Sequence, residues 1–368
     1  MHRRVALLAV VLPLLPSLAG CLGGGSGRTE WAYDVTQLAV LAQEGRTGRG
    51  VTVAFLDTGI NAHHPSMKHL VDGNRDNGEL VAFRDFLGSA NTVAQAFDDD
   101  GHGTHVAGIL AARGGSGLDK LGGIDLEGGA PDVDLVVARV CSQNTCDASV
   151  IPAAIDWAVA QGADVVSLSL GGQFGLRDAV TERNIESSVS RAVASGTVVI
   201  SSAGNGGPGA APQNQTTDVE SPGNIPEVIA VGAVDEHGQV AGFSSRGDDA
   251  GHPCRSTPLP LPMGLSGRCP PDQKPELVAP GVGILSAWTK NLYVQADGTS
   301  QATPFVTAAV ALILQGHPDL PGSGDVARLK QALVSTAQPL AGQQRPHDPA
   351  AGYGLVQAAA ALQAFNGS

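Results

Sequence analysis

Short apolar runs alternate with longer segments of helical periodicity along most of this chain, and this alternation restricts its fold more than any other feature. Short apolar runs predict buried strands, and longer segments with apolar residues three or four apart predict helices. Strands are predicted at residues 51–56, 135–140, 165–170, 198–202 and 228–234. Helices are predicted at residues 102–112, 149–161, 185–195, 299–315 and 326–336. This order predicts an α/β fold of three layers, with a mostly parallel central sheet flanked by helices on both faces.

Two stretches interrupt the alternation, near residues 114–129 and 248–273. The first is rich in Gly and polar residues, and the second is rich in Pro, Gly and Cys. We interpret both as surface insertions in one domain, because strands or helices resume on either side. The 49 glycines and the aromatic content of 4% indicate many tight turns and a core of small aliphatic side chains.

The formal net charge of −13 argues against nucleic acid as a partner. Binding to phosphates needs clustered Lys and Arg side chains, and this chain has an excess of acidic ones. The acidity is interpreted first as an aid to solubility, and it would secondarily favour cationic ligands.

The first twenty residues have the pattern of an export signal. A basic start precedes an apolar stretch at residues 5–18, which is shorter than the roughly 20 residues that a membrane-spanning helix needs. Leu-Ala-Gly-Cys at residues 18–21 resembles the lipobox of bacterial lipoproteins, in which the cysteine carries the lipid. We therefore expect a signal peptide at residues 1–20, lipidation of Cys21 and a flexible tether at residues 21–30. Cleavage after the preceding Ser-Leu-Ala is the alternative, and it would release a secreted protein.

Lipidation of the first cysteine would leave four others in an exported chain, an even number that suggests disulfides. Three pairings are possible. The local pairs are favoured because each encloses a short polar loop: Cys141 with Cys146, and Cys254 with Cys269. A zinc site is the weaker alternative, since no His lies at ligand spacing from either pair.

Three segments supply the side chains that nucleophilic hydrolysis by serine requires. That chemistry needs a hydroxyl, a base that takes its proton, and a buried carboxylate that fixes the tautomer of the base and stabilises its charged form. Asp57 follows a predicted strand, and ligand crevices in open parallel sheets form where strands end. His102 and Ser300 each lie at the start of a predicted helix. Each residue alone has an ordinary structural interpretation, so the set of three is what indicates catalysis.

These segments resemble the catalytic motifs of the subtilase (subtilisin) family. They read VAFLDTG at residues 53–59, DGHGTHVAG at residues 100–108 and GTSQATP at residues 298–304. Their order along the chain is that of subtilisin. The resemblance implies a subtilisin-like peptidase domain at residues 31–365, with the insertions noted above. It also implies that the catalytic residues are Asp57, His102 and Ser300.

The resemblance assigns further residues to binding. Asn205, in the segment SAGN, matches the donor of the oxyanion hole of the family. Residues Ser169, Leu170 and Gly171 match the strand edge with which the family pairs the extended backbone of its substrate. Glu220 lies close to where the family closes its side-chain pocket, and a carboxylate there would favour Arg, Lys or polar side chains on the acyl side of the cut bond. The alternative is that Glu220 is a solvated loop residue.

The chain departs from the family pattern in three places. Gln301 follows the serine where most subtilisins carry an oxidation-sensitive Met, so we expect tolerance to peroxide. The stretch between Cys21 and Asp57 is too short for the usual folding propeptide, so we expect folding unaided or with a separate helper. No cofactor is required for the chemistry. Whether the chain binds a structural calcium ion is left open, and no ligands are assigned, because Ser66 stands where the family pattern has a carboxylate.

The expected function is therefore that of a serine endopeptidase that acts through an acyl-enzyme at an extracytoplasmic surface. Its expected partners are polypeptide substrates and, through the lipid anchor, a membrane, and we expect it to act as a monomer. The alternatives are a catalytically silent subtilase-like binding lipoprotein and a non-enzymatic lipoprotein scaffold.

Overall fold

The computed structural model describes most of the chain after its N-terminal segment. The described residues are 29–114, 126–143, 145–172, 179–216, 218–247, 273–317, 322–343 and 347–367. The expected signal peptide, residues 21–28 of the expected tether and most of both insertions lie outside these ranges. The last two tether residues are described: Thr29 is buried and Glu30 begins a helix, so the flexible tether does not extend to residue 30. Within them, every helix falls short of the length and apolar character that a membrane span requires.

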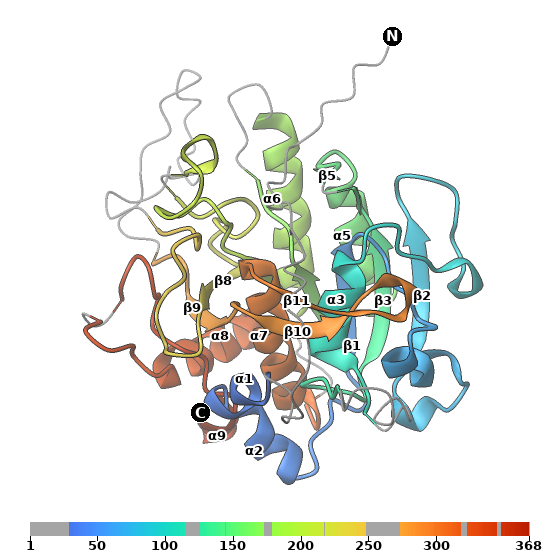
Figure 1. Ribbon diagram of the computed structural model, residues 1–368, viewed down its shortest axis with the longest axis horizontal. Coiled ribbons are helices and arrows are strands. Elements are labelled where there is room, and N and C mark those ends of the chain that lie inside the picture. Colours follow the sequence, from blue (N-terminus) through green and yellow to red (C-terminus); the bar gives the residue numbers. More distant parts are fainter. Residues whose placement is uncertain are drawn as a thin grey trace.

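A seven-stranded parallel sheet forms the centre of the molecule (Figure 1). In spatial order it contains β2 (Leu80–Asp85), β3 (Asp134–Arg139), β1 (Thr52–Asp57), β6 (Val165–Leu168), β7 (Val198–Ser202), β8 (Ile229–Val234) and β9 (Leu277–Pro280). Every neighbouring pair runs parallel. The inner strands are buried along nearly their whole length, as expected when helices cover both faces.

Helices cover the sheet on both sides. They are α1 (Glu30–Val35), α2 (Leu38–Gln43), α3 (His102–Ala111), α5 (Ile151–Ala160), α6 (Ala179–Ala194), α7 (Thr299–Leu314), α8 (Ser323–Thr336) and α9 (Ala358–Gly367). Helix α7 packs against α3 and against strands β6 to β9, while α5 and α6 pack against each other and against strands of the sheet. Short 3₁₀ helices occur at Pro65–Val71, Arg75–Asn77, Val93–Gln95, Pro212–Asn214 and Thr289–Asn291. This three-layer arrangement confirms the predicted fold class.

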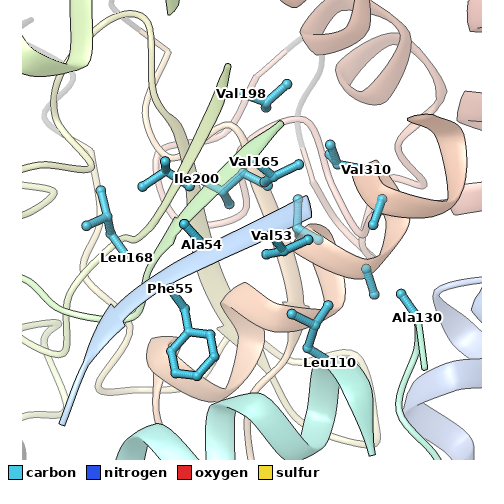
Figure 2. Close-up of a cluster of buried hydrophobic side chains, with 14 of the residues drawn as sticks. Val53, Ala54, Phe55, Leu110, Ala130, Val165, Leu168, Val198, Ile200 and Val310 are labelled. Carbon is cyan, nitrogen blue, oxygen red and sulfur yellow. The ribbon is translucent and has the colours of Figure 1, made fainter. Parts of the chain in front are cut away.

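The core is built from small aliphatic side chains, as the composition predicts. Figure 2 shows Val53 and Phe55 of β1 close to Leu110 of α3 and Val310 of α7. All four are at most 1% exposed. Helix α7 is buried along its entire length, so it lies inside the molecule and its N-terminal end is held firmly at one edge of the sheet.

The ten predicted elements are all present, with ends that shift by a few residues. The largest shift is in α6, which begins at Ala179 rather than at residue 185. Strands β2 and β9 were not predicted, because β2 mixes buried with exposed positions and β9 ends at a proline. The antiparallel hairpin of β10 (Ile284–Ala287) and β11 (Tyr293–Ala296) was also missed, as were α1, α2 and α9.

The first insertion is described only at its ends, and its second end is packed rather than exposed. Leu126 is 6% exposed. The Gly128 N–H donates to the carbonyl of Ala112, directly after α3, at 2.7 Å, and the Gly129 N–H donates to the carbonyl of Ile109 in α3 at 3.0 Å. The surface part of this insertion therefore does not extend to residue 129.

Candidate active site

The predicted site residues meet at one edge of the sheet. Strands β1, β6 and β7 are neighbours, and all three end at this edge. Helices α3 and α7 begin there, because His102 and Thr299, their first residues, line the same cavity as the strand ends. A single cavity at this edge is lined by all eight residues that the sequence pointed to: Asp57, His102, Ser169, Leu170, Gly171, Asn205, Glu220 and Ser300.

Asp57 and His102 form a buried carboxylate–imidazole pair. His102 Nδ1 lies 2.7 Å from Asp57 Oδ1, and both side chains are almost completely shielded from water. Burial alone would lower the pKa of His102, but the charge of Asp57 and its hydrogen bond outweigh burial and raise that pKa above its ordinary value. The carboxylate thus fixes the Nδ1–H tautomer and leaves Nε2 as the nitrogen that can accept a proton.

Asp98 fixes the start of α3 against the end of β1. Its Oδ1 accepts hydrogen bonds from Thr58 Oγ1 and the Gly101 N–H, both at 2.9 Å. Its Oδ2 accepts from the N–H and the hydroxyl of Thr104, at 2.9 and 2.7 Å. Because Thr58 follows Asp57 and Gly101 precedes His102, this one carboxylate sets the position of both members of the pair.

His105, one turn after His102, has a structural role. Its Nε2 lies 3.1 Å from the Ile284 carbonyl and 3.0 Å from the Val294 carbonyl. Burial lowers its pKa to about 3, so the ring stays neutral and joins α3 to the β10–β11 hairpin.

Ser300 is the second residue of α7 and is 7% exposed. Its hydroxyl donates to the Ser169 carbonyl at 2.9 Å, and among the described residues this is the hydrogen bond it makes. The hydroxyl and the imidazole of His102 face the same cavity. The positive end of the α7 dipole lies at Ser300 and would stabilise negative charge that forms there.

The amide of Asn205 is oriented by Thr299. Asn205 Oδ1 accepts from the Thr299 N–H and from Thr299 Oγ1, both at 3.0 Å. Since the oxygen is held in this way, the Nδ2 group is the end of the amide that remains to donate to a bound group. Thr299 was not singled out from the sequence, although its place directly before Ser300 was a signal.

Residues 169–171 follow strand β6 and line the cavity. The Leu170 carbonyl accepts from Ser202 Oγ at 2.9 Å and so points into the protein. The Ser169 carbonyl is the one that lies beside Ser300, because it accepts the hydrogen bond of the Ser300 hydroxyl.

Glu220 packs between two glycines at the wall of the cavity. A Cβ atom built on Gly204 would lie 2.5 Å from Glu220 Cδ, and one built on Gly171 would lie 3.0 Å from Oε2. Side chains at those two positions would therefore displace the carboxylate. Burial raises the pKa of Glu220 to about 7, although a hydrogen bond from the Asn205 N–H favours the ionised form. Glu220 is thus a partly buried residue of the cavity wall rather than a fully exposed loop residue.

One of the two expected cysteine pairs is described. Cys141 and Cys146 form a disulfide on the β4–β5 hairpin (Cys141–Ser142 and Thr145–Cys146), and both line the cavity. Cys21, Cys254 and Cys269 lie outside the described residues. The described part of the chain contains no group of three or more His, Cys, Asp or Glu side chains that could hold a metal ion.

A parallel sheet that presents a buried carboxylate–imidazole pair, a serine at a helix start and an oriented amide has the architecture of a serine hydrolase. Comparison with known proteins identifies the family. The sequence profile of the subtilase family matches residues 48–354. The chain belongs to the subtilase family, and it is a subtilisin-like serine endopeptidase that needs no cofactor for catalysis.

Several characterised relatives are similar over most of the chain. Subtilisin DY of Bacillus licheniformis is 35% identical over 295 residues, which are 80% of this chain and 86% of that protein. Subtilisin E of Bacillus subtilis (strain 168) is 33% identical over 308 residues, which are 83% of this chain and 65% of that protein. Serine protease AprX of the same strain is 33% identical over 303 residues, and the match spans 74% of this chain and 59% of that protein.

Proposed function

We propose that this endopeptidase uses Asp57, His102 and Ser300 as its catalytic triad. The observation that carries the proposal is the 2.7 Å contact of His102 Nδ1 with a buried Asp57, in the same cavity as the Ser300 hydroxyl. Rotation about χ1 of Ser300 would move Oγ from the Ser169 carbonyl toward His102 Nε2. Such closing of catalytic hydrogen bonds on substrate binding is common in serine hydrolases.

In the proposed reaction, Ser300 Oγ attacks the carbonyl carbon of the peptide bond while its proton passes to His102 Nε2. The tetrahedral intermediate collapses when the C–N bond breaks, and His102 returns the proton to the leaving amine. Water then attacks the acyl-ester, again with His102 as base, and Ser300 is regenerated. Asp57 stabilises the imidazolium in both halves of the reaction without taking its proton.

The negative oxygen of the intermediate would accept hydrogen bonds from Asn205 Nδ2 and from the Ser300 N–H. Both donors are fixed before the substrate arrives, because Thr299 holds the Asn205 carbonyl oxygen and the Ser300 N–H belongs to the first turn of α7. Donors held in place in this way stabilise the transition state without reorganisation during the reaction.

The substrate backbone would pair with residues 169–171 as an added strand. The carbonyls of Ser169 and Gly171 would be the acceptors for its N–H groups, since both residues line the cavity. This pairing would bring an extended polypeptide past Ser300, as an endopeptidase requires.

We further propose that the chain is exported and acts as a monomer at an extracytoplasmic membrane surface. The signal-like residues 1–20 and the lipobox-like site at Cys21 support the export and the anchor. In this proposal, a tether after Cys21 leads to the peptidase domain at residues 31–365. The Cys141–Cys146 disulfide fits an oxidising compartment, where a Cys254–Cys269 bond would also persist. Fatty-acid labelling of the full chain should be lost in Cys21→Ala, and unlabelled wild type in the medium would contradict the anchor.

Hydrolysis of casein and of peptides tests the triad. Changing Ser300, His102 or Asp57 to Ala should each lower kcat by roughly 10⁴-fold or more, and the double change of Ser300 and His102 should add little. Ser335→Ala, at an exposed serine on α8, is the matched control and should keep full activity. Hydrolysis that survives Ser300→Ala would overturn the proposal.

A further inference from the structure

Glu220 presents a carboxylate to the cavity that no cation of the described residues neutralises. Its backbone N–H donates to the Ala203 carbonyl at 2.9 Å, so its position is fixed relative to the segment that carries Asn205. The hydrogen bond to its carboxylate comes from the Asn205 N–H. An ionised carboxylate in a partly closed site without a counter-charge is unfavourable unless a ligand supplies one.

The cavity as a whole is acidic. Besides Glu220, its ionisable lining groups are Asp57, Asp100 and His102, and no Lys or Arg of the described residues lines it. Asp57 is already paired with His102, and Asp100 Oδ1 accepts the His102 N–H at 3.3 Å. Glu220 is the remaining carboxylate, and it lies between the segments that contain Gly171 and Gly204.

The glycines at 171 and 204 create the space for this carboxylate. The φ angle of Gly204 is 105°, a conformation that other residues rarely adopt. A Cβ atom at Gly204 or at Gly171 would come within 2.5 or 3.0 Å of the Glu220 side chain and displace it. The antiparallel bridge between Gly172 and Ser221 then holds the Glu220 segment against the edge that binds substrate backbone. A side chain that enters the cavity beside residues 169–171 would therefore lie next to the Glu220 carboxylate.

We propose that Glu220 determines specificity by pairing with a Lys or Arg side chain on the residue whose carbonyl Ser300 attacks. This inference rests on the proposed function. An ammonium or guanidinium group would supply the missing counter-charge through charge-assisted hydrogen bonds, and its methylene groups would pack against Leu170 and the glycine walls. The enzyme would then process polypeptides after basic residues.

Matched peptides test this directly. The peptides differ at one position, the residue before the cut bond, which is Arg, citrulline, Lys or Leu. Citrulline has the shape of Arg without its charge. Wild type should cleave the Arg peptide with kcat/KM at least tenfold above the citrulline peptide, and Glu220→Gln should reduce this ratio to near one. Glu236→Gln removes an exposed carboxylate elsewhere and should leave the ratio unchanged.

A binding measurement provides a readout apart from catalysis. Benzamidine, a small amidinium cation, should bind Ser300→Ala at least tenfold more tightly than the double variant with Glu220→Gln. Equal cleavage of Arg and citrulline peptides by wild type, or equal benzamidine affinity in the two proteins, would overturn the assignment of Glu220 while leaving the proposed function intact. Failure to hydrolyse any of the peptides would overturn the proposed function and this inference with it.

Discussion

Glu220→Gln should make the unliganded protein more stable, because the native carboxylate is held in an unfavourable site. Its pKa is raised from 4.5 to about 7. A shift of one pKa unit corresponds to about 1.4 kcal/mol, so ionisation destabilises the fold by at most about 3.5 kcal/mol. We expect about 2 kcal/mol, because solvent reaches part of the side chain and screens its charge. Gln keeps the shape and an acceptor for the Asn205 N–H but carries no charge.

The sign of the pH dependence follows from proton binding. An acid with a raised pKa holds its proton longer in the folded than in the unfolded state, so the free energy of unfolding falls as pH rises from 4.5 to about 7. The stabilisation by Glu220→Gln should therefore be below about 1 kcal/mol at pH 5 and reach about 2 kcal/mol at pH 8.

Urea unfolding at the two pH values measures this difference. Ser300→Ala is introduced in every protein to prevent self-digestion, and Glu236→Gln controls for the loss of one charge. A stabilisation that is the same at pH 5 and pH 8, or a destabilisation at pH 8, would refute the claim that Glu220 is partly buried without a counter-charge.

Three further predictions concern catalysis. Because Asp57 raises the pKa of His102, kcat/KM should fall with decreasing pH through an inflection above the ordinary 6.5. Asp57→Asn should move that inflection to lower pH, and an inflection that stays in place would contradict the pairing of the two residues. Asn205→Ala should lower kcat by roughly 10²–10³-fold with little change in KM, measured by steady-state kinetics, and a loss confined to KM would argue for a substrate-binding role instead. Wild type should keep its activity in peroxide while Gln301→Met loses it over time, and equal rates of inactivation would show that oxidation acts elsewhere.

The fold was largely predictable because its strands are buried on both faces. The segments that became β1, β3, β6, β7 and β8 read as continuous apolar runs, and the helices between them are amphipathic or apolar. Strand β2 was missed because it alternates imperfectly at the edge of the sheet. The β10–β11 hairpin was missed for a different reason: it is fixed by long-range contacts, such as those of His105 with Ile284 and Val294.

The positions of the chemical groups were predictable, and their environment was not. Asp57, His102 and Ser300 lie in recognisable motifs, and the sheet order brings them to one edge. The partly buried position of Glu220 depends on space left by glycines in two other segments, which no local pattern reveals. The role of Asp98 could not be predicted from the sequence. Its partner Thr58 lies 40 residues away along the chain, and its partner Thr104 lies inside the helix that begins after it.

Covalent labelling with a fluorophosphonate tests the central claim most directly, namely that Ser300 is a nucleophile activated by His102. Peptide mapping by mass spectrometry should place a single phosphonate adduct on Ser300. The adduct should be absent in Ser300→Ala and should form far more slowly in His102→Ala, while Ser335→Ala should label like wild type. An adduct on another residue, or no labelling of folded wild type, would contradict the account.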